Sequence, residues 1–259
     1  MSYTLDETKL AMKSIESPSL GKSPYDTLRR IARYYIDDGQ PRDSVRKSVE
    51  EYVLKCDKDA SLVKWDKTIS AAIQYASKHE AVNISSIPIT TSELDAIDSL
   101  TTGSQSQRLA FTLLCLAKYW NKRNGVESFW VNSKDSDIMQ MANIKTSIRR
   151  QSKLYHDLRE HGMISFSHKI DCNHVRVDFA DTNSAVKLEI KDMRSLGNQY
   201  LMYTGQPYFV CAECGIVEKQ QQRIHESGRK HKYCVECAAK VAASQKLAYA
   251  RKMRKSAEM

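Results

Sequence analysis

Apolar residues in the first part of the chain recur with the 3.6-residue period of a helix that buries one face. The clearest such face consists of Val45, Val49, Tyr52, Val53 and Cys56. Similar patterns precede and follow it, so residues 23–81 are predicted to form a unit of three helices. Residues 1–22 lack a sustained period, and they are expected to be a flexible tail.

The middle of the chain is organised around one strongly apolar helix, predicted at residues 105–121. Its buried face is expected to hold Leu109, Leu113, Leu116, Ala117 and Trp120, with Phe111 and Leu114 beside it. Cys115 lies between two leucines of this helix and is expected to be a buried core residue. The preceding residues 82–104 are rich in serine, threonine, proline and glycine. They are predicted to be a linker that holds one short helix at 92–100.

The elements predicted after this helix follow the order of a winged helix-turn-helix. They are a short strand at 129–131, a short helix at 134–143, a longer helix at 146–161 and two strands at 163–170 and 174–180. Helix, strand, helix, helix and hairpin is the order of that fold, so residues 105–182 are predicted to form an α+β winged-helix domain. Residues 183–206 are expected to be a connecting segment with a strand at 186–190 and a helix at 193–203.

Basic side chains gather on the N-terminal half of the predicted helix 146–161. They are Lys145, Arg149, Arg150 and Lys153, and the expected inward positions are Ile144, Ile148, Tyr155 and Leu158. In helix-turn-helix proteins this half of the second helix enters the major groove, where basic side chains contact phosphates and base edges. Lys169 and Arg176, near the predicted hairpin, are candidates for contacts with a flanking groove. The alternative is an ordinary solvated helix face.

Two Cys-x-x-Cys pairs near the end of the chain predict a metal site. Cys211 and Cys214 form the first pair, and Cys234 and Cys237 form the second. Two residues between the thiols of a pair let the backbone point both sulfurs at one ion, and four thiolates complete the tetrahedron that Zn²⁺ prefers. Gly215 follows the first pair, where a tight metal-binding turn needs positive φ. Residues 207–259 are therefore predicted to be a treble-clef or zinc-ribbon finger that binds one structural zinc ion and ends in a long helix.

The cysteines also have other possible interpretations. A disulfide framework would need an oxidising compartment, whereas the first residues do not resemble a signal peptide and the cysteines number seven, an odd total. His225 or His231 could replace one thiol, although four cysteines already fill a zinc site. The sequence therefore favours a reducing, cytoplasmic location and four thiolate ligands.

The formal net charge of +9 is unevenly distributed along the chain. Acidic residues slightly outnumber basic residues before position 100, and the basic excess lies after it. The predicted C-terminal helix ends in the basic run Arg251, Lys252, Arg254 and Lys255, suited to phosphate contact unless it is simply a frayed terminus. No apolar run approaches the roughly 20 residues of a membrane span. The chain is therefore expected to be soluble, and the uneven charge favours nucleic acid as its partner.

One resemblance adds to this interpretation. The winged-helix-like middle, the Leu-Gly-Asn-Gln-Tyr-Leu segment at 196–201 and the two cysteine pairs resemble uncharacterised proteins of bacteriophages and mobile elements in Gram-positive bacteria. In outline the chain is also similar to phage replication-initiator and replisome-organiser proteins. The resemblance covers about residues 85–259, and it implies a phage or mobile-element origin and the host bacterial cytoplasm as location.

The expected function is not enzymatic. The chain has no GxxxxGK[ST], GxGxxG or HExxH motif, and a four-thiolate zinc site leaves no position for a reacting water. We therefore expect a mainly α, multi-domain protein that binds duplex DNA in phage replication initiation or transcription control. The alternative is an anti-defence protein, of the anti-CRISPR type, whose basic surfaces bind and inhibit a host nucleoprotein complex.

Overall fold

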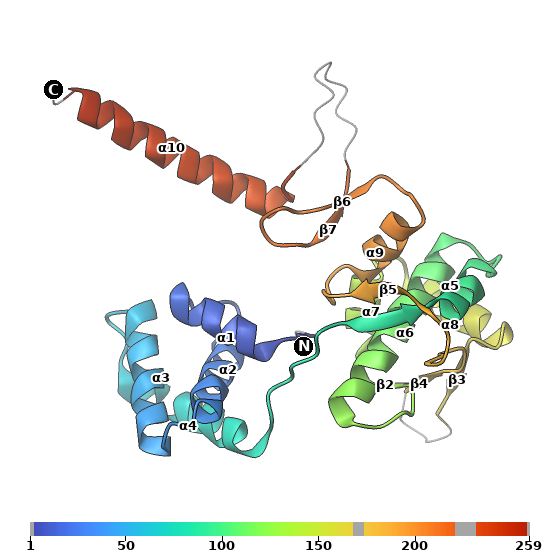
Figure 1. Cartoon of the computed structure of the whole chain (residues 1–259), viewed down its shortest axis with the longest axis horizontal. Helices are drawn as coiled ribbons and strands as arrows, with labels where there is room; N and C mark the ends of the chain where they lie inside the picture. Colours follow the sequence, from blue (N-terminus) through green and yellow to red (C-terminus); the bar gives the residue numbers. More distant parts are fainter. Residues whose placement is uncertain (1–2, 168–173, 221–231, 258–259) are drawn as a thin grey trace. The chain divides into compact units, whose positions relative to one another are not determined.

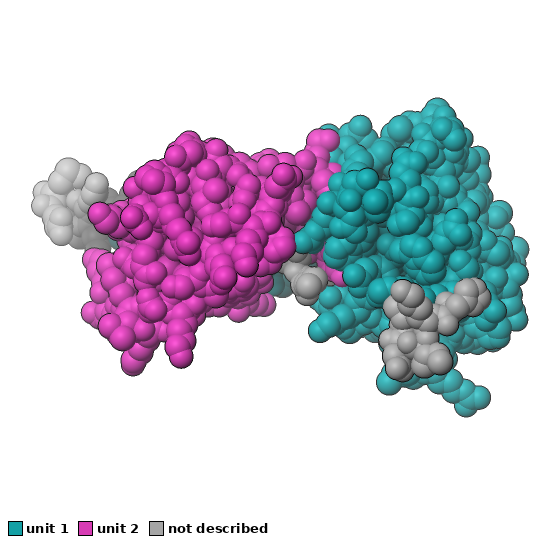
Figure 2. Space-filling view, turned by 90° about the horizontal axis from the view of Figure 1, so that it is seen from below, with its two compact units in different colours: residues 1, 86–259 teal, residues 2–85 magenta. Residues whose placement is uncertain are grey.

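The computed structural model describes residues 3–167, 174–220 and 232–257, without the side chains of 251, 252 and 254–257. Residues 2–85 form one compact unit, magenta in Figure 2, and residues 86–259 form another, teal in Figure 2; they are called the first and the second unit in the order of the chain. Most described elements are helices, and short antiparallel strands accompany them in the second unit (Figure 1). The mainly helical composition agrees with the prediction from the apolar periodicity.

The first unit contains the three predicted helices and one more. Its helices are α1 (Glu7–Glu16), α2 (Pro24–Asp37), α3 (Arg42–Cys56) and α4 (Leu62–Lys78). The apolar faces of α2, α3 and α4 meet in one core, in which Leu28, Val49 and Ile69 are fully buried. Each of these helices buries a continuous stripe, which is why the period was visible in the sequence.

The expectation that residues 1–22 form a flexible tail is wrong, because α1 packs against α2. Among the described residues 3–22, only Leu5 and Ala11 are buried apolar residues, so the segment has no long apolar period. Its helix begins at the cap Asp6, whose carboxylate accepts a hydrogen bond from the backbone of Lys9 at 2.7 Å. The carboxylate of Glu7 then pairs with Arg29 of α2 at 3.1 Å. Polar contacts with α2 thus replace part of the missing apolar face.

The second unit is built on α6 (Ser104–Asn124), the predicted apolar helix. Every residue from Leu109 to Tyr119 is buried, so the middle of the helix is enclosed on all sides. Cys115 is fully buried as predicted, and burial raises the pKa of its thiol. Trp120, expected on the buried face, is only half-buried, and its indole N–H donates to the Ser133 hydroxyl at 3.1 Å.

Around α6 lie shorter elements, several of them near their predicted positions. They are α5 (Thr91–Asp98), β2 (Trp130–Val131), α7 (Asp135–Met141), α8 (Ile148–Glu160), β3 (Ile164–Phe166) and β4 (Val175–Val177). The three strands form an antiparallel sheet in the order β2-β4-β3, in which Ile164 lies opposite Val177. The tip predicted between the last two strands falls outside the described residues.

Residues 86–104 of the predicted linker and the connecting segment 183–206 are instead parts of this unit, and residues 82–85 belong to the first unit. The strand β1 (Ile87–Thr90) pairs antiparallel with β5 (Val186–Ile190), and β1 contacts α6 (Figure 1). Ile87 and Ile89 are fully buried, so the segment cannot act as a free linker. The correction has a physical reason. The two strands pair across about a hundred residues, and no local pattern reveals such a partner.

A buried ion pair joins these elements. Lys118 of α6 donates from Nζ to the Glu93 carboxylate at 2.7 Å, to the Pro88 carbonyl at 2.9 Å and to the Asp181 carbonyl at 3.2 Å. Glu93 is fully buried and also accepts from the backbone of Thr90 and of Asp181, each at 2.8 Å. Both charges are therefore hydrogen-bonded, as buried charges must be. Thr90 and Glu93 also form a capping box at the N-terminus of α5.

Candidate metal centre and basic surface

The four predicted metal ligands come from a small hairpin and the start of the last helix. The strands β6 (Tyr208–Val210) and β7 (Val217–Lys219) pair antiparallel, and Cys211 and Cys214 lie in the turn between them. Gly215 in this turn has φ +75°, as predicted, a conformation that glycine adopts without strain. Cys234 immediately precedes α10 (Val235–Ala257), and Cys237 lies in its first turn.

The structure brings all four thiols together. Their Sγ atoms all lie within 4.8 Å of one another, and those of Cys214 and Cys234 are 3.7 Å apart. A tetrahedral ion with Zn–S bonds of about 2.3 Å would separate its sulfurs by about 3.8 Å. Cys211, Cys234 and Cys237 are buried, and Cys214 is half-buried. The arrangement is therefore compatible with a structural metal site, and the candidates His225 and His231 lie outside the described residues.

Backbone hydrogen bonds prepare one of these sulfurs for ionisation. Burial disfavours the Cys211 thiolate, but N–H groups of Cys214, Cys234 and Glu213 outweigh it and lower the pKa of Cys211 to about 6. The contact with Cys234, together with burial, raises the pKa of Cys237 to about 12. Four thiolates this close repel one another, so a cation is needed to keep all of them deprotonated.

The helix α9 (Leu196–Tyr203) attaches this cysteine cluster to the rest of the unit. Asn198 donates from its amide to the Val217 carbonyl of β7 at 2.9 Å and accepts from the Asn143 amide at 2.8 Å. Arg194, just before α9, donates to the Cys214 carbonyl at 2.6 Å. Since Asn143 lies in the turn between α7 and α8, one buried side chain connects that turn to the cysteine-bearing hairpin.

Other residues of the Leu-Gly-Asn-Gln-Tyr-Leu segment also have structural roles. Leu196 is fully buried, and the Tyr200 hydroxyl donates to Asp98 of α5 at 2.6 Å. A Cβ atom added at Gly197 would lie 2.1 Å from the backbone oxygen of Ala142, so only glycine allows α9 to approach α7 this closely. The sequence showed the segment but not its contacts.

Substituting Gly197 by alanine is expected to destabilise the second unit by about 1–3 kcal/mol, because the Ala142 backbone must move to admit a methyl group. Urea unfolding followed by circular dichroism would measure the change. The control is Thr204→Ala at the exposed end of the same helix, expected to stay within about 0.5 kcal/mol of wild type. Equal losses in both variants would contradict the close approach.

The predicted basic residues on α8 all point to solvent. Lys145, Arg149, Arg150 and Lys153 are exposed, and none has a hydrogen-bond or ion-pair partner among the described residues. Tyr155 and Leu158 are buried as expected, and so is Ile144 before the helix. The expectation for Ile148 is wrong, because this first residue of α8 is 80% exposed and Leu154 takes the inward position. The apolar period had predicted a buried stripe that starts one helical turn earlier than the observed one.

The remaining basic candidates have different environments. Arg176 of β4 is exposed and lies 3.6 Å from the carboxylate of Asp178, so part of its charge is already paired. Lys169 lies outside the described residues. The backbone of Arg251, Lys252, Arg254 and Lys255 belongs to α10, and their side chains are outside the described part.

Comparisons with known protein families, with curated proteins and with solved structures find no match. In the described ranges, no helix is both long and apolar enough to cross a membrane. The cysteine cluster and the exposed basic residues around the start of α8 are therefore the features that bear on function.

Proposed function

We propose that the chain is a DNA-binding protein that combines a winged helix, residues 105–182, with a structural zinc finger. The exposed, unpaired cations on the N-terminal half of α8 carry this proposal. Solvated cations are ordinary, but four of them around the start of one helix form a surface suited to phosphates and base edges. The chain's net charge of +9 favours the same class of partner.

The elements around α8 support the winged-helix part of the proposal. The helices α6, α7 and α8 are followed by the hairpin β3–β4, and β2 completes the sheet. In this arrangement α8 is the recognition helix, because Leu154 and Leu158 bury its inner face while Arg149 and Arg150 stay accessible. The hairpin is then the wing, and Arg176 on it would contact the flanking backbone.

Zinc is the proposed metal for the cysteine cluster. Four thiolates at tetrahedral spacing are the commonest ligand set of structural Zn²⁺ sites. Cys211, Cys214, Cys234 and Cys237 would fill its coordination shell, so the ion would stabilise the finger without taking part in a reaction. Replication initiation or transcription control in a phage or mobile element is the role that we propose for this activity.

The double substitution Arg149→Ala, Arg150→Ala is expected to abolish preference for any particular duplex sequence. A bidentate contact of arginine with guanine is worth about 1–3 kcal/mol of discrimination, and alanine offers no donor. The measurement is selection from a random duplex library, followed by anisotropy titration of the enriched sequence at several salt concentrations. A variant that enriches the same sequence as wild type would contradict a recognition helix.

Two further variants are titrated with the same duplexes. The control Lys64→Ala, Lys67→Ala removes the same charge from exposed positions of α4 and is expected to retain the preference. Deletion of residues 251–259 is expected to weaken binding to all sequences alike and to flatten the salt dependence by roughly one unit of slope per lost contact. If wild-type protein binds no duplex but copurifies with a host nucleoprotein complex, the inhibitor alternative replaces this proposal.

A further inference from the structure

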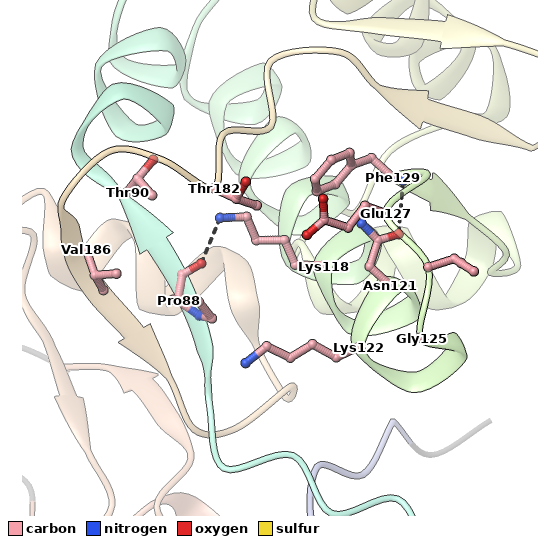
Figure 3. A pocket seen from close by; sticks show the side chains of 11 residues that line it. Pro88, Thr90, Lys118, Asn121, Lys122, Gly125, Glu127, Phe129, Thr182 and Val186 are labelled. Carbon is pink, nitrogen blue, oxygen red and sulfur yellow. Dashed lines mark hydrogen bonds between the residues drawn. The ribbon is translucent and has the colours of Figure 1, made fainter.

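A pocket of about 330 Å³ lies between the β1–β5 sheet and the C-terminal end of α6. Pro88, Thr90 and Val186 line it from the strands, and Lys122, Glu127 and Phe129 line it from α6 and the following loop (Figure 3). None of the basic residues assigned to DNA binding lines this pocket. It is therefore a separate site, and the inference below does not depend on the proposed DNA-binding function.

The loop that carries Phe129, the aromatic residue lining the pocket, is held in place by hydrogen bonds. The side-chain oxygen of Asn121 accepts hydrogen bonds from the backbone N–H groups of Phe129 at 3.0 Å and Ser128 at 3.2 Å. Phe129 has φ +54°, a left-handed conformation that is rare for an aromatic residue. The two hydrogen bonds compensate for this strain, so the Phe129 ring is positioned before any ligand arrives.

Two charged side chains of the pocket, Lys122 and Glu127, can still form hydrogen bonds with a ligand. Lys118 already donates to three acceptors, so it has no further hydrogen to offer. Lys122 is exposed and donates to one acceptor, the Ser86 carbonyl at 2.8 Å, which leaves two of its three hydrogens. Glu127 is exposed, and it has no hydrogen-bond or ion-pair partner among the described residues.

These groups are arranged for a ligand with an anionic end, a flat ring and an amino donor. In Figure 3, Glu127 and Phe129 lie together on one side of the pocket, and Lys122 lies apart from them. An ammonium binds a phosphate, an aromatic ring stacks on a base, and a carboxylate accepts from an exocyclic amino group. A purely apolar ligand would contact the Phe129 ring but would pair with neither Lys122 nor Glu127.

We propose that this pocket binds a single nucleotide whose base carries an exocyclic amino group, as adenine, cytosine and guanine do. The base stacks on Phe129, its amino group donates to Glu127, and its phosphate accepts from Lys122. This nucleotide is either a free mononucleotide or the unpaired end of a single strand, because both present the same groups.

The test is calorimetric titration of the full-length protein with AMP and CMP, and with IMP and UMP as matched ligands that lack the amino group. AMP and CMP are expected to bind at least about tenfold more tightly than IMP and UMP, because Glu127 then has a donor to pair with. Equal affinity of the four nucleotides, or no binding at all by free nucleotides and strand ends, would overturn the proposal.

Two oligonucleotides distinguish the sources of the nucleotide. A duplex with a single-stranded adenine overhang and the same duplex with blunt ends are titrated in parallel. Tighter binding of the overhang duplex than of the blunt duplex identifies a strand end as the ligand. Equal binding of the two duplexes, together with binding of AMP, identifies a free nucleotide. Equal binding of the two duplexes without binding of AMP would overturn the proposal.

Variants assign the contacts. Lys122→Ala and Phe129→Leu are each expected to weaken AMP binding about tenfold, whereas Glu127→Gln is expected to erase the preference for AMP over IMP. Lys67→Ala, on α4, is the matched control and is expected to bind AMP as wild type does. Thermal melts check that each variant is folded, and an unchanged AMP affinity in folded Lys122→Ala and Phe129→Leu would reject the pocket.

The variants also separate this proposal from the DNA-binding proposal. Arg149→Ala, Arg150→Ala is expected to lose duplex preference and keep AMP binding, whereas Lys122→Ala is expected to do the reverse. Loss of AMP binding in the α8 variant would show that the nucleotide binds on α8 instead of in the pocket.

Discussion

Replacing Cys211 by serine is expected to unfold β6, β7 and the first turn of α10 while the other helices persist. In zinc-finger peptides, metal binding contributes apparent free energies of about 10–16 kcal/mol to folding, and it is the dominant stabilising term in such modules. The cysteine cluster has few apolar neighbours to compensate, chiefly Ile216 and Tyr233. Removing one thiolate therefore removes most of what holds the hairpin to the helix.

Two measurements check this expectation. Elemental analysis of protein purified without chelator is expected to find one zinc per chain in wild type and less than one in the variant. Amide hydrogen exchange is expected to show loss of protection in β6, β7 and the first turn of α10, and not in the other helices. Cys56→Ser, in α3 and outside the cluster, is the control and is expected to keep its zinc. Wild-type protein that contains no zinc would contradict the assignment, and stoichiometric iron would reassign the metal.

The second large effect is expected at the buried ion pair. Glu93→Ala is expected to destabilise the second unit by about 3–5 kcal/mol, because it leaves the Lys118 ammonium buried without a countercharge. It also removes the acceptor of two backbone N–H groups, those of Thr90 and Asp181. Urea unfolding, with the unit of residues 2–85 as an internal reference, would measure the loss.

Matched variants test whether the charge itself is responsible. Glu189→Ala removes an exposed carboxylate of β5, 3.8 Å from Lys191, and is expected to cost less than about 1 kcal/mol. Adding Lys118→Met to Glu93→Ala is expected to recover part of the stability, because no unpaired charge then remains in the core. If Glu93→Ala costs no more than Glu189→Ala, the ion pair is not an important contributor to stability.

The amino-acid pattern was informative wherever a single element buries its own stripe. It predicted α2, α3, α4 and α6 because each of these helices has a long apolar face whose period is local. It missed α1, in which Ala11 is the one buried apolar residue and the buried Glu7 pairs with Arg29 of α2. The bounds predicted for β5 agree with the structure, although its partner strand was taken for a linker.

For the candidate sites, the sequence by itself determined the residue types and their spacing. It identified the four cysteines, because a Cys-x-x-Cys pair is a local feature. It also identified the exposed basic side chains of α8, because the helical period shows which positions face away from the buried stripe. The prediction that both cysteine pairs meet is confirmed. Only the tertiary structure decided that Asn198 connects their hairpin to the turn before α8. The same holds for the Lys118–Glu93 pair and for the pocket beside it. Each joins residues far apart in the chain, and such contacts arise only when the helices and strands pack together.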